Sequence, residues 1–236
     1  MVRQQRRFHL QWPPAGLVRF GQLRRLTPIS PVFALDRGLP IERYYIAQFL
    51  RRHQADIRGV ALEFGDTAYL DAFGGDRVTA KEVFSYVPSP AASVVGDLAG
   101  AGPLPEGRYD CIVCTQTIQM IYDVRTAVGR LSAMLRPGGV LLLTSHGTSK
   151  VGRHLDRDGW GEYWHLTEQG LRSLMADRFD GEVEVTGYGN VLAAVAALHG
   201  LASEELQPGE LDHRDRDFDV IVAARAVRRG GPPALT

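Results

Sequence analysis

Two acidic residues follow hydrophobic segments of the chain and could bind a nucleoside. Glu82 stands near the end of residues 77–84, and Asp97 ends residues 92–97. A carboxylate at the first position can accept hydrogen bonds from both hydroxyls of a ribose. A carboxylate at the second can accept one from the amino group of an adenine. Together they predict a site for an adenosine-containing ligand.

Two of the seven histidines stand where they could act on a second molecule. His146 directly follows the hydrophobic residues 140–145, and His165 lies in the next loop. Histidine is the usual base near neutral pH. We predict a catalytic role for these two residues, and a structural or solvated role is the alternative that the sequence leaves open.

The loop 150–166 concentrates aromatic and acidic side chains. Trp160, Tyr163 and Trp164 could stack on a sugar or on another flat, polar acceptor, and we predict that they bind the substrate. They could equally fix the loop to the core. The acids Asp156, Asp158 and Glu162 form a possible oxygen ligand set for a metal ion.

The elements that must position these residues alternate between strand and helix. Strands are predicted at residues 59–64, 77–84, 92–97, 109–116, 140–145, 182–188 and 218–227. Helices are predicted at residues 41–53, 126–135, 167–179 and 191–201. This alternation predicts an α/β fold with a mostly parallel sheet and helices on both faces. In such sheets the ligand binds beyond the carboxyl ends of the strands, so the loops after them should line one crevice.

Composition narrows the function classes. The chain has 236 residues, with 27 Lys and Arg against 27 Asp and Glu, so its formal net charge is zero. We therefore expect no nucleic-acid partner. No stretch is long and apolar enough for a transmembrane helix, no signal peptide is evident, and no membrane partner is expected. The two cysteines, Cys111 and Cys114, are predicted to be buried small hydrophobic residues in a reducing compartment, which favours a cytoplasmic protein.

The chain divides into three predicted parts. Residues 1–35 form an arginine-rich leader that lies over the domain or acts as a lid, residues 36–229 form the main domain, and 230–236 form a loose tail. The loop after the first strand keeps Gly65 but lacks G-x-G-x-x-G. NAD binding is therefore disfavoured, because a pyrophosphate needs those glycines for close backbone approach.

Residues 36–227 resemble the class I S-adenosylmethionine-dependent methyltransferases of the bacterial type 11 group. The resemblance rests on YDCIVCTQTIQMIYDVRTAVGRLSAMLRPGGVLLLTS at 109–145, which ends in an L-x-P-G-G turn and the next strand. ALEFGD at 61–66 resembles the first glycine motif of that family. Only Gly65 of its three glycines is present, with Thr67 and Tyr69 at the other two positions. The family fold implies a doubly wound, Rossmann-like sheet of seven strands whose last strand is antiparallel.

The resemblance implies S-adenosyl-L-methionine as the cofactor. It assigns to the cofactor Tyr44, Glu63, Gly65, Glu82, Asp97, Leu98 and Gln116. Glu63 and Gly65 would line the methionine moiety, and Gln116 would lie near the transferred methyl group. Glu82 would bind the ribose, and Asp97 with Leu98 the adenine. Tyr44 belongs to a helix that would cover the methionine carboxylate.

The predicted reaction is methyl transfer to a hydroxyl group of a small molecule or glycan. Methylation of an amino sugar or other amine is the first alternative. A cofactor-binding protein of the same fold that transfers no methyl group is the second, because the glycine motif is incomplete. No metal is predicted, because metal-dependent relatives carry acids where this chain has Thr115, Gln116 and Thr117.

Overall fold

The computed structural model describes residues 13–14, 17–154 and 160–230. The first part of the predicted arginine-rich leader (residues 1–12 and 15–16), nearly all of the predicted tail, and the acids Asp156 and Asp158 lie outside these residues. The side chains of residues 153, 154 and 160 are also outside them, so the predicted stacking role of Trp160 stays a prediction. None of the helices in the described ranges is long and apolar enough to cross a membrane.

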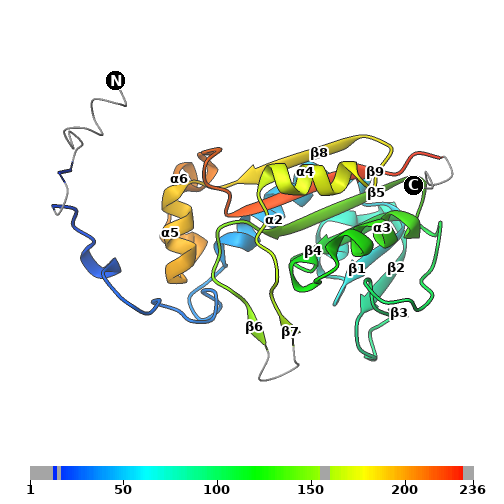
Figure 1. Cartoon of the computed structure of the whole chain (residues 1–236), viewed down its shortest axis with the longest axis horizontal. Helices are drawn as coiled ribbons and strands as arrows, with labels where there is room; N and C mark the ends of the chain where they lie inside the picture. The colour runs from blue at the N-terminus through cyan, green and yellow to red at the C-terminus, as the bar shows by residue number, and fades with distance from the viewer. Residues whose placement is uncertain (1–12, 15–16, 155–159, 231–236) are drawn as a thin grey trace.

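Seven strands form one sheet in the order β3-β2-β1-β4-β5-β9-β8 (Figure 1). They are β1 (Gly59–Phe64), β2 (Val78–Ser85), β3 (Val94–Val95), β4 (Tyr109–Thr115), β5 (Leu135–His146), β8 (Val183–Tyr188) and β9 (Ile221–Val227). The strands β1 to β5 are parallel, and β9 runs antiparallel to both of its neighbours, β5 and β8. This order confirms the predicted doubly wound sheet and its antiparallel last strand.

Helices cover both faces of the sheet. They are α2 (Ile41–Arg52), α3 (Val124–Met134), α4 (Glu168–Ala176), α5 (Val191–His199) and the short α6 (Pro208–Asp212). Residues of α3 and α4 pack on one face, and residues of α2 and α5 on the other. Side chains cap three of the helices: Asp123, Thr167 and Asn190 accept hydrogen bonds from backbone N–H groups of α3, α4 and α5.

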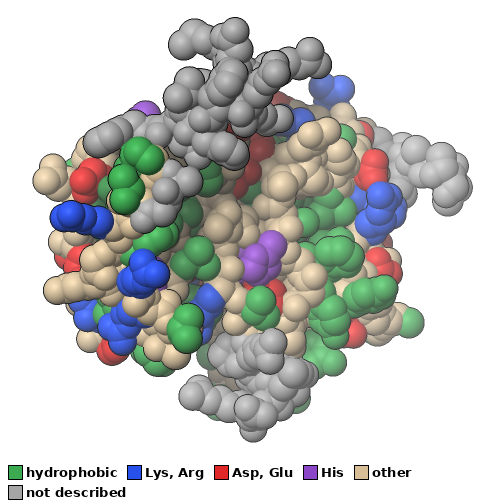
Figure 2. All heavy atoms as spheres, turned by 60° about the vertical axis from the view of Figure 1, so that its left-hand side comes forward, with side chains coloured by type: hydrophobic (Ala, Val, Ile, Leu, Met, Phe, Trp, Pro, Cys, Tyr) green, Lys and Arg blue, Asp and Glu red, His purple; other side chains and the backbone are tan. Residues whose placement is uncertain are grey.

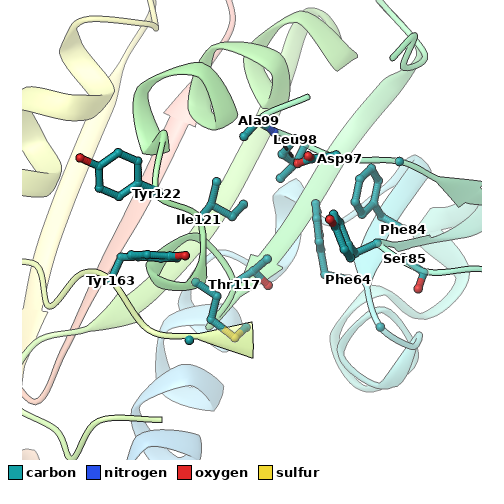
Figure 3. Close-up of a pocket in the computed structure, with 15 residues that line it drawn as sticks. Phe64, Phe84, Ser85, Asp97, Leu98, Ala99, Thr117, Ile121, Tyr122 and Tyr163 are labelled. Carbon is teal, nitrogen blue, oxygen red and sulfur yellow. Dashed lines mark hydrogen bonds between the residues drawn. The ribbon is translucent and has the colours of Figure 1, made fainter. Parts of the chain in front are cut away.

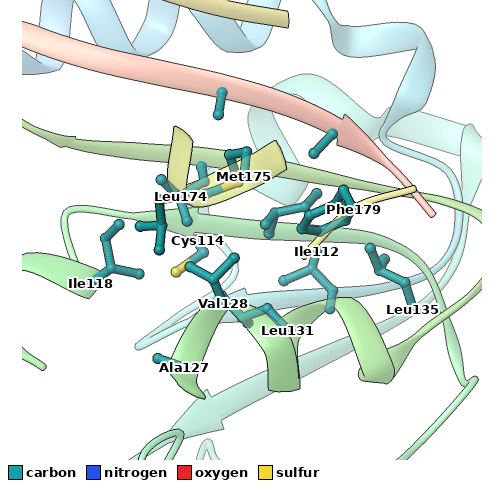
Figure 4. Close-up of a cluster of buried hydrophobic side chains, with 14 of the residues drawn as sticks. Ile112, Cys114, Ile118, Ala127, Val128, Leu131, Leu135, Leu174, Met175 and Phe179 are labelled. Carbon is teal, nitrogen blue, oxygen red and sulfur yellow. The ribbon is translucent and has the colours of Figure 1, made fainter. Parts of the chain in front are cut away.

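The core on each face is continuous through β4. Ile112 and Cys114 pack with Leu131 of α3 and Leu174 of α4 (Figure 4). The alternate side chains of the strand, which include Cys111, face the opposite layer. Both cysteines are buried and free, as predicted. Because β4 is buried on both faces, its sequence is an almost unbroken apolar run and does not alternate between apolar and polar residues.

The half of the sheet that carries β1 to β3 has short connections. In the segment 65–77 between β1 and β2, the two helical residues Ala68 and Tyr69 lead into the π-helical turn η3 (Leu70–Gly74) and the 3₁₀ turn η4 (Gly75–Arg77). Residues 86–93 and 96–108, all of them described, contain no helix. The strand predicted at 92–97 is also shorter, because only Val94 and Val95 pair with β2. This half is therefore open on the side of the strand ends.

A segment that we call the strap, residues 29–39, precedes α2. The backbone N–H groups of Ile29 and Ser30 donate to the carbonyl of His199 at 2.9 and 3.1 Å. The Ser30 hydroxyl donates to Asp36 at 2.5 Å. Between these anchors the strap turns through Phe33 and Ala34, whose φ angles are 58° and 64°. Two successive side chains in the left-handed region are strained, so the anchors must hold the turn in place.

The strap depends on a glycine at the end of α5. Gly200 has φ +68°, and a Cβ added there would lie 2.3 Å from the backbone oxygen of Ser30. We predict that Gly200→Ala lowers the free energy of unfolding by about 2 kcal/mol or more, from the left-handed strain and this clash. Urea unfolding measures the loss. Gly209→Ala is the matched control, because nothing lies within 4 Å of its added Cβ. Equal stability of the two variants would contradict this account.

Candidate functional site

A cavity of about 410 Å³ opens at the carboxyl ends of β1 and β2 and beside the loops that follow β3 and β4. We call it the first cavity. Gly65, Asp97 and Leu98, all predicted from the sequence to bind the cofactor, line it. In Figure 3 the rings of Phe64 and Phe84 lie on one side, and Tyr122 and Tyr163 on the other. The structure therefore brings three of the predicted cofactor residues together at the expected edge of the sheet.

The floor of the first cavity requires a glycine. Gly65 has φ +88°, a conformation that favours glycine, and no atom lies within 4 Å of an added Cβ. Asp97, which lines the same cavity, accepts a hydrogen bond from the backbone N–H of Ala99 at 2.8 Å. Arg130 donates to the backbone carbonyl of Asp97 at 2.9 Å and fixes this loop from outside. Phe64 and Phe84 supply an apolar wall, with ring centroids 4.7 Å apart.

Aromatic rings form the outer wall of the first cavity. Tyr163 lines it together with Tyr122, and their rings meet edge to face at 5.5 Å. Trp164 stacks on Tyr122 at 6.1 Å and donates its indole N–H to the carbonyl of Ile121 at 3.0 Å. Tyr122 and Tyr163 are largely exposed. Of the aromatic residues predicted to bind substrate, Tyr163 thus faces the cavity, and Trp164 both supports this wall and fixes the loop.

A second cavity, of about 230 Å³, adjoins the first at Met120, which lines both. Gln116, predicted to lie near the transferred methyl group, lines it in a left-handed conformation with φ 50°. Gln119 donates to the Gln116 side-chain oxygen at 2.9 Å and fixes its orientation. Phe33 of the strap lines the opposite wall. The two cavities therefore lie side by side along the ends of the strands.

His146 and Glu162 line the second cavity. Together with His165, which lies beside them but lines neither cavity, they form what we call the histidine cluster. The Nδ1 atom of His146 lies 2.5 Å from Glu162 Oε1, and Nε2 of His165 lies 3.5 Å from the same oxygen. The other Glu162 oxygen accepts from the backbone N–H of Gly152 at 2.5 Å. Burial raises the pKa of Glu162, but these hydrogen bonds and the nearby histidines outweigh it and hold that pKa below its usual range. The two histidines predicted as catalytic thus share one buried carboxylate.

Sequence reasoning missed two carboxylates of this cavity. Glu162 was grouped with Asp156 and Asp158, and nothing in the loop sequence indicates that it pairs with His146, sixteen residues earlier. Glu42 also lines the cavity, and burial raises the pKa of its carboxyl group. An available signal was its position on the buried face of α2, beside Ile41 and Tyr45.

Glu63 supports the site from beneath and lines neither cavity. Its carboxylate accepts hydrogen bonds from the backbone N–H groups of Tyr69 and Leu70 at 3.1 and 2.8 Å, and so caps the turn η3. Burial raises its pKa to about 7, against the lowering effect of these two hydrogen bonds. The carboxylate thus contacts the backbone of its own chain, and the expected contact with a methionine moiety stays a prediction.

Two other predicted cofactor residues lie away from the cavities. Glu82 pairs with Leu62 in the middle of the β1–β2 ladder, because β2 continues to Ser85. Its carboxylate accepts from the Tyr109 hydroxyl at 2.8 Å and pairs with Arg108 at the start of β4. Ser85 and Tyr86 occupy the strand end in the cavity wall instead.

Tyr44 is also placed differently from the expectation. Its hydroxyl donates to Asp212 at 2.7 Å and so ties α2 to α6. The residue beside it in sequence, Arg43, is the one that lines the second cavity.

The residues that replace the missing glycines do not fill either cavity. The Thr67 hydroxyl donates to Asp71 at 2.8 Å, and the Tyr69 hydroxyl accepts from Arg43 at 2.6 Å. Neither residue is part of a cavity wall. The space above Gly65 remains open.

Comparison with known families decides the classification. The family described as "Methyltransferase domain" matches residues 40–193, about two thirds of the chain. The chain belongs to this methyltransferase-domain family. The match spans α2, the strands β1 to β5, all residues that line the first cavity, and those of the second cavity except Phe33 and Leu35. This agrees with the resemblance that the sequence shows at residues 109–145.

Relatives of this methyltransferase-domain protein share only part of its length. Uncharacterized methyltransferases of Mycobacterium tuberculosis and Mycobacterium bovis are 33% identical over 81 residues, which is 34% of this chain and 36% of theirs. The matched stretch thus spans little more than a third of these curated relatives.

Solved structures share the fold at low identity. An S-adenosylmethionine-dependent methyltransferase from Mesorhizobium loti has a TM-score of 0.52 at 14% identity and covers 80% of this chain and 98% of its own. The N-methyltransferase NodS from Bradyrhizobium japonicum, in complex with S-adenosylhomocysteine, has a TM-score of 0.50 at 16% identity. The match covers 85% of this chain and 94% of NodS. The [4+2]-cyclase SpnF has a TM-score of 0.52 at 16% identity, and the match covers 83% of this chain and 85% of SpnF. At these identities the likeness concerns the Rossmann-like fold alone.

The buried carboxyl of Glu63 should make stability depend on pH. Its folded pKa of about 7 lies above its ordinary value of 4.5, so the folded state holds the proton more tightly. This contribution is present in full below the ordinary value and is lost as the pH rises to about 7. We predict that Glu63→Gln gains stability relative to the wild type between about pH 5 and pH 7, and that the difference is constant above about pH 8.

Urea unfolding at several pH values measures this difference. Glu106→Gln, at an exposed position that lines neither cavity, is the control and should show no such trend. A difference between Glu63→Gln and the wild type that does not change with pH would contradict the assigned role of Glu63.

Proposed function

We propose that this protein transfers a methyl group from S-adenosyl-L-methionine to a hydroxyl group of a small molecule or glycan. The observation that carries the proposal is the pair of cavities that meet at Met120. One has the walls that an adenosine needs, and the other has a basic cluster. A donor and an acceptor bound in them would face each other along the ends of the strands.

The first cavity suits the nucleoside part of the cofactor. Its apolar wall of Phe64, Phe84 and Leu98 suits a flat base, and Asp97 lies at the position expected to bind adenine. In place of Glu82, we assign the ribose to the region of Ser85 and Tyr86, because these residues line the cavity at the end of β2. When bound, the cofactor supplies a methyl group already activated by its sulfonium sulfur.

The second cavity suits an acceptor that must lose a proton. In the reaction, the acceptor oxygen forms a bond to the methyl carbon, and the carbon–sulfur bond breaks with its electron pair going to sulfur. The hydroxyl proton is taken up by the histidine cluster, with His146 nearest the acceptor. The main contribution of the cavities is to hold oxygen and methyl in line, which accounts for several orders of magnitude in rate.

The walls of the second cavity favour an acceptor with several hydroxyl groups. Glu42, Arg43 and Gln116 offer hydrogen-bond acceptors and donors. Tyr122 and Tyr163 at the adjoining rim offer exposed rings that can stack on a sugar. This combination supports a glycan or a small polyol.

An amine acceptor is the second candidate, and one observation favours it. Two buried carboxylates, Glu42 and Glu162, line the second cavity and would attract a cationic amine. An amine needs less help from a base than a hydroxyl. Variants of the two histidines therefore separate the candidates.

Cofactor binding tests the first cavity. We predict that the wild type binds S-adenosylhomocysteine in calorimetric titration, and that Gly65→Leu loses about tenfold or more in affinity because the new side chain enters the cavity. Gly75→Leu is the matched control. Gly75 also has a positive φ and open space at its Cβ, but it lies outside both cavities. Absence of binding to the wild type would end the proposal.

The same titration of Glu82→Gln decides the ribose assignment. Unchanged affinity is expected from its position in the ladder. A clear loss of affinity would restore the contact expected from the sequence.

Methyl transfer tests the acceptor side. With hydroxylated glycosides as test acceptors, we predict that His146→Ala lowers the rate of S-adenosylhomocysteine formation by about a hundredfold and leaves cofactor affinity unchanged. His165→Ala should lower it less, because that ring is farther from Glu162 Oε1. The exposed His213 supplies the control variant His213→Ala. Unchanged rates in both cluster variants would favour the amine.

A further inference from the structure

Three potential metal ligands meet beside the second cavity, and two of them, His146 and Glu162, line it. The ring nitrogens of His146 and His165 and a carboxylate oxygen of Glu162 all lie within 4.8 Å of one another. His146 ends β5, whereas Glu162 and His165 lie in the loop after the short strand β7 (Trp160–Gly161). We propose that the histidine cluster binds one divalent transition-metal ion, with zinc as its best match.

The donor set suits zinc. Two imidazoles and one carboxylate form a known ligand set of catalytic zinc, with metal–ligand distances of about 2.0–2.1 Å. Ligands at that distance in a tetrahedron lie about 3.3 Å apart. The separation of 3.5 Å between His165 Nε2 and Glu162 Oε1 is close to this value. The 2.5 Å between His146 Nδ1 and Glu162 Oε1 must lengthen, and the partly exposed ring of His165 can follow the adjustment.

The surroundings hold the ligands in place. The second oxygen of Glu162 accepts from the Gly152 N–H at 2.5 Å, which fixes the carboxylate in the way that outer hydrogen bonds orient metal ligands. The side chain of Glu162 is 3% exposed and that of His146 is 12% exposed. Glu42, a second buried acidic residue, lines the same cavity and offers further oxygen atoms near the cluster. Arg43 is a cation on this wall, and its guanidinium donates to the hydroxyl of Tyr69.

Three protein ligands leave a coordination position for another molecule. Both His146 and Glu162 line the second cavity, so the open position would face the acceptor. A hydroxyl bound there would lose its proton more readily, because a metal ion lowers the pKa of a bound oxygen. In the loaded protein the histidines act as ligands, and the proton leaves to solvent. This role of the ion in activating the acceptor rests on the proposed methyl transfer, whereas the binding of the ion to the cluster does not.

The experiment uses the full chain without an affinity tag, stripped with a chelator that is then removed. Zinc chloride is titrated by calorimetry, and cobalt chloride by visible absorption, which reports four- or five-coordinate cobalt. We expect one ion per chain. Glu162→Gln and His165→Ala should each weaken binding by about tenfold or more, since each removes a ligand. His213→Ala, an exposed histidine outside the cluster, should bind like the wild type.

Two outcomes would overturn the inference: no uptake of zinc or cobalt by the wild type, or uptake that is the same in His165→Ala. The partly exposed position of His165 keeps this second variant informative even if Glu162→Gln fails to fold. S-adenosylhomocysteine is titrated into the same samples. A protein that binds S-adenosylhomocysteine but takes up no zinc would contradict the metal site and leave the proposed function standing. A protein that takes up zinc but does not bind S-adenosylhomocysteine would contradict the proposed function and leave the metal site standing.

Discussion

The carboxylate of Glu162 connects the loop after β5 to the end of the sheet, and both cavities depend on that connection. One oxygen meets His146 at the end of β5, and the other accepts from Gly152 in the same loop. The neighbours of Glu162 in sequence then form cavity walls: Gly161 and Tyr163 border the first cavity. A buried carboxylate is stable only with such partners. The contact that satisfies its charge therefore also positions the loop over the strand ends.

The fold could be predicted because its determinants are local and repeated. The apolar run of β4 is buried on both faces, and the amphipathic pattern of α2 begins and ends at the predicted residues to within one position. Thr167, the first residue of the predicted helix 167–179, caps α4 through its side chain. The differences concern ends and connections: β3 is reduced to two residues, and β5 begins at Leu135 because the L-x-P-G-G turn joins the strand. On the face shown in Figure 2, basic side chains lie among acidic and hydrophobic ones, as the zero net charge suggests.

The site could be predicted only in part, since its side chains are positioned by long-range contacts. Gly65, Asp97 and Leu98 follow strand ends directly, and strand ends meet at one edge of a parallel sheet. The position of Glu82 could not be predicted, because a sequence does not state how far β2 continues, and its carboxylate is paired with Arg108 and Tyr109. The pairing of His146 with Glu162 depends on how a loop folds back, which no local pattern encodes.

The incomplete glycine motif is compatible with an open cavity for a physical reason. Glycines allow close approach of the backbone where side chains would intrude. Here the side chains of Thr67 and Tyr69 are held elsewhere, by Asp71 and Arg43. The Glu63 carboxylate accepts hydrogen bonds from two backbone N–H groups at the start of the turn η3. These N–H groups would otherwise have no partner within the turn. Only the position with φ +88° at the cavity floor still requires a glycine, and it is the one that this chain has kept.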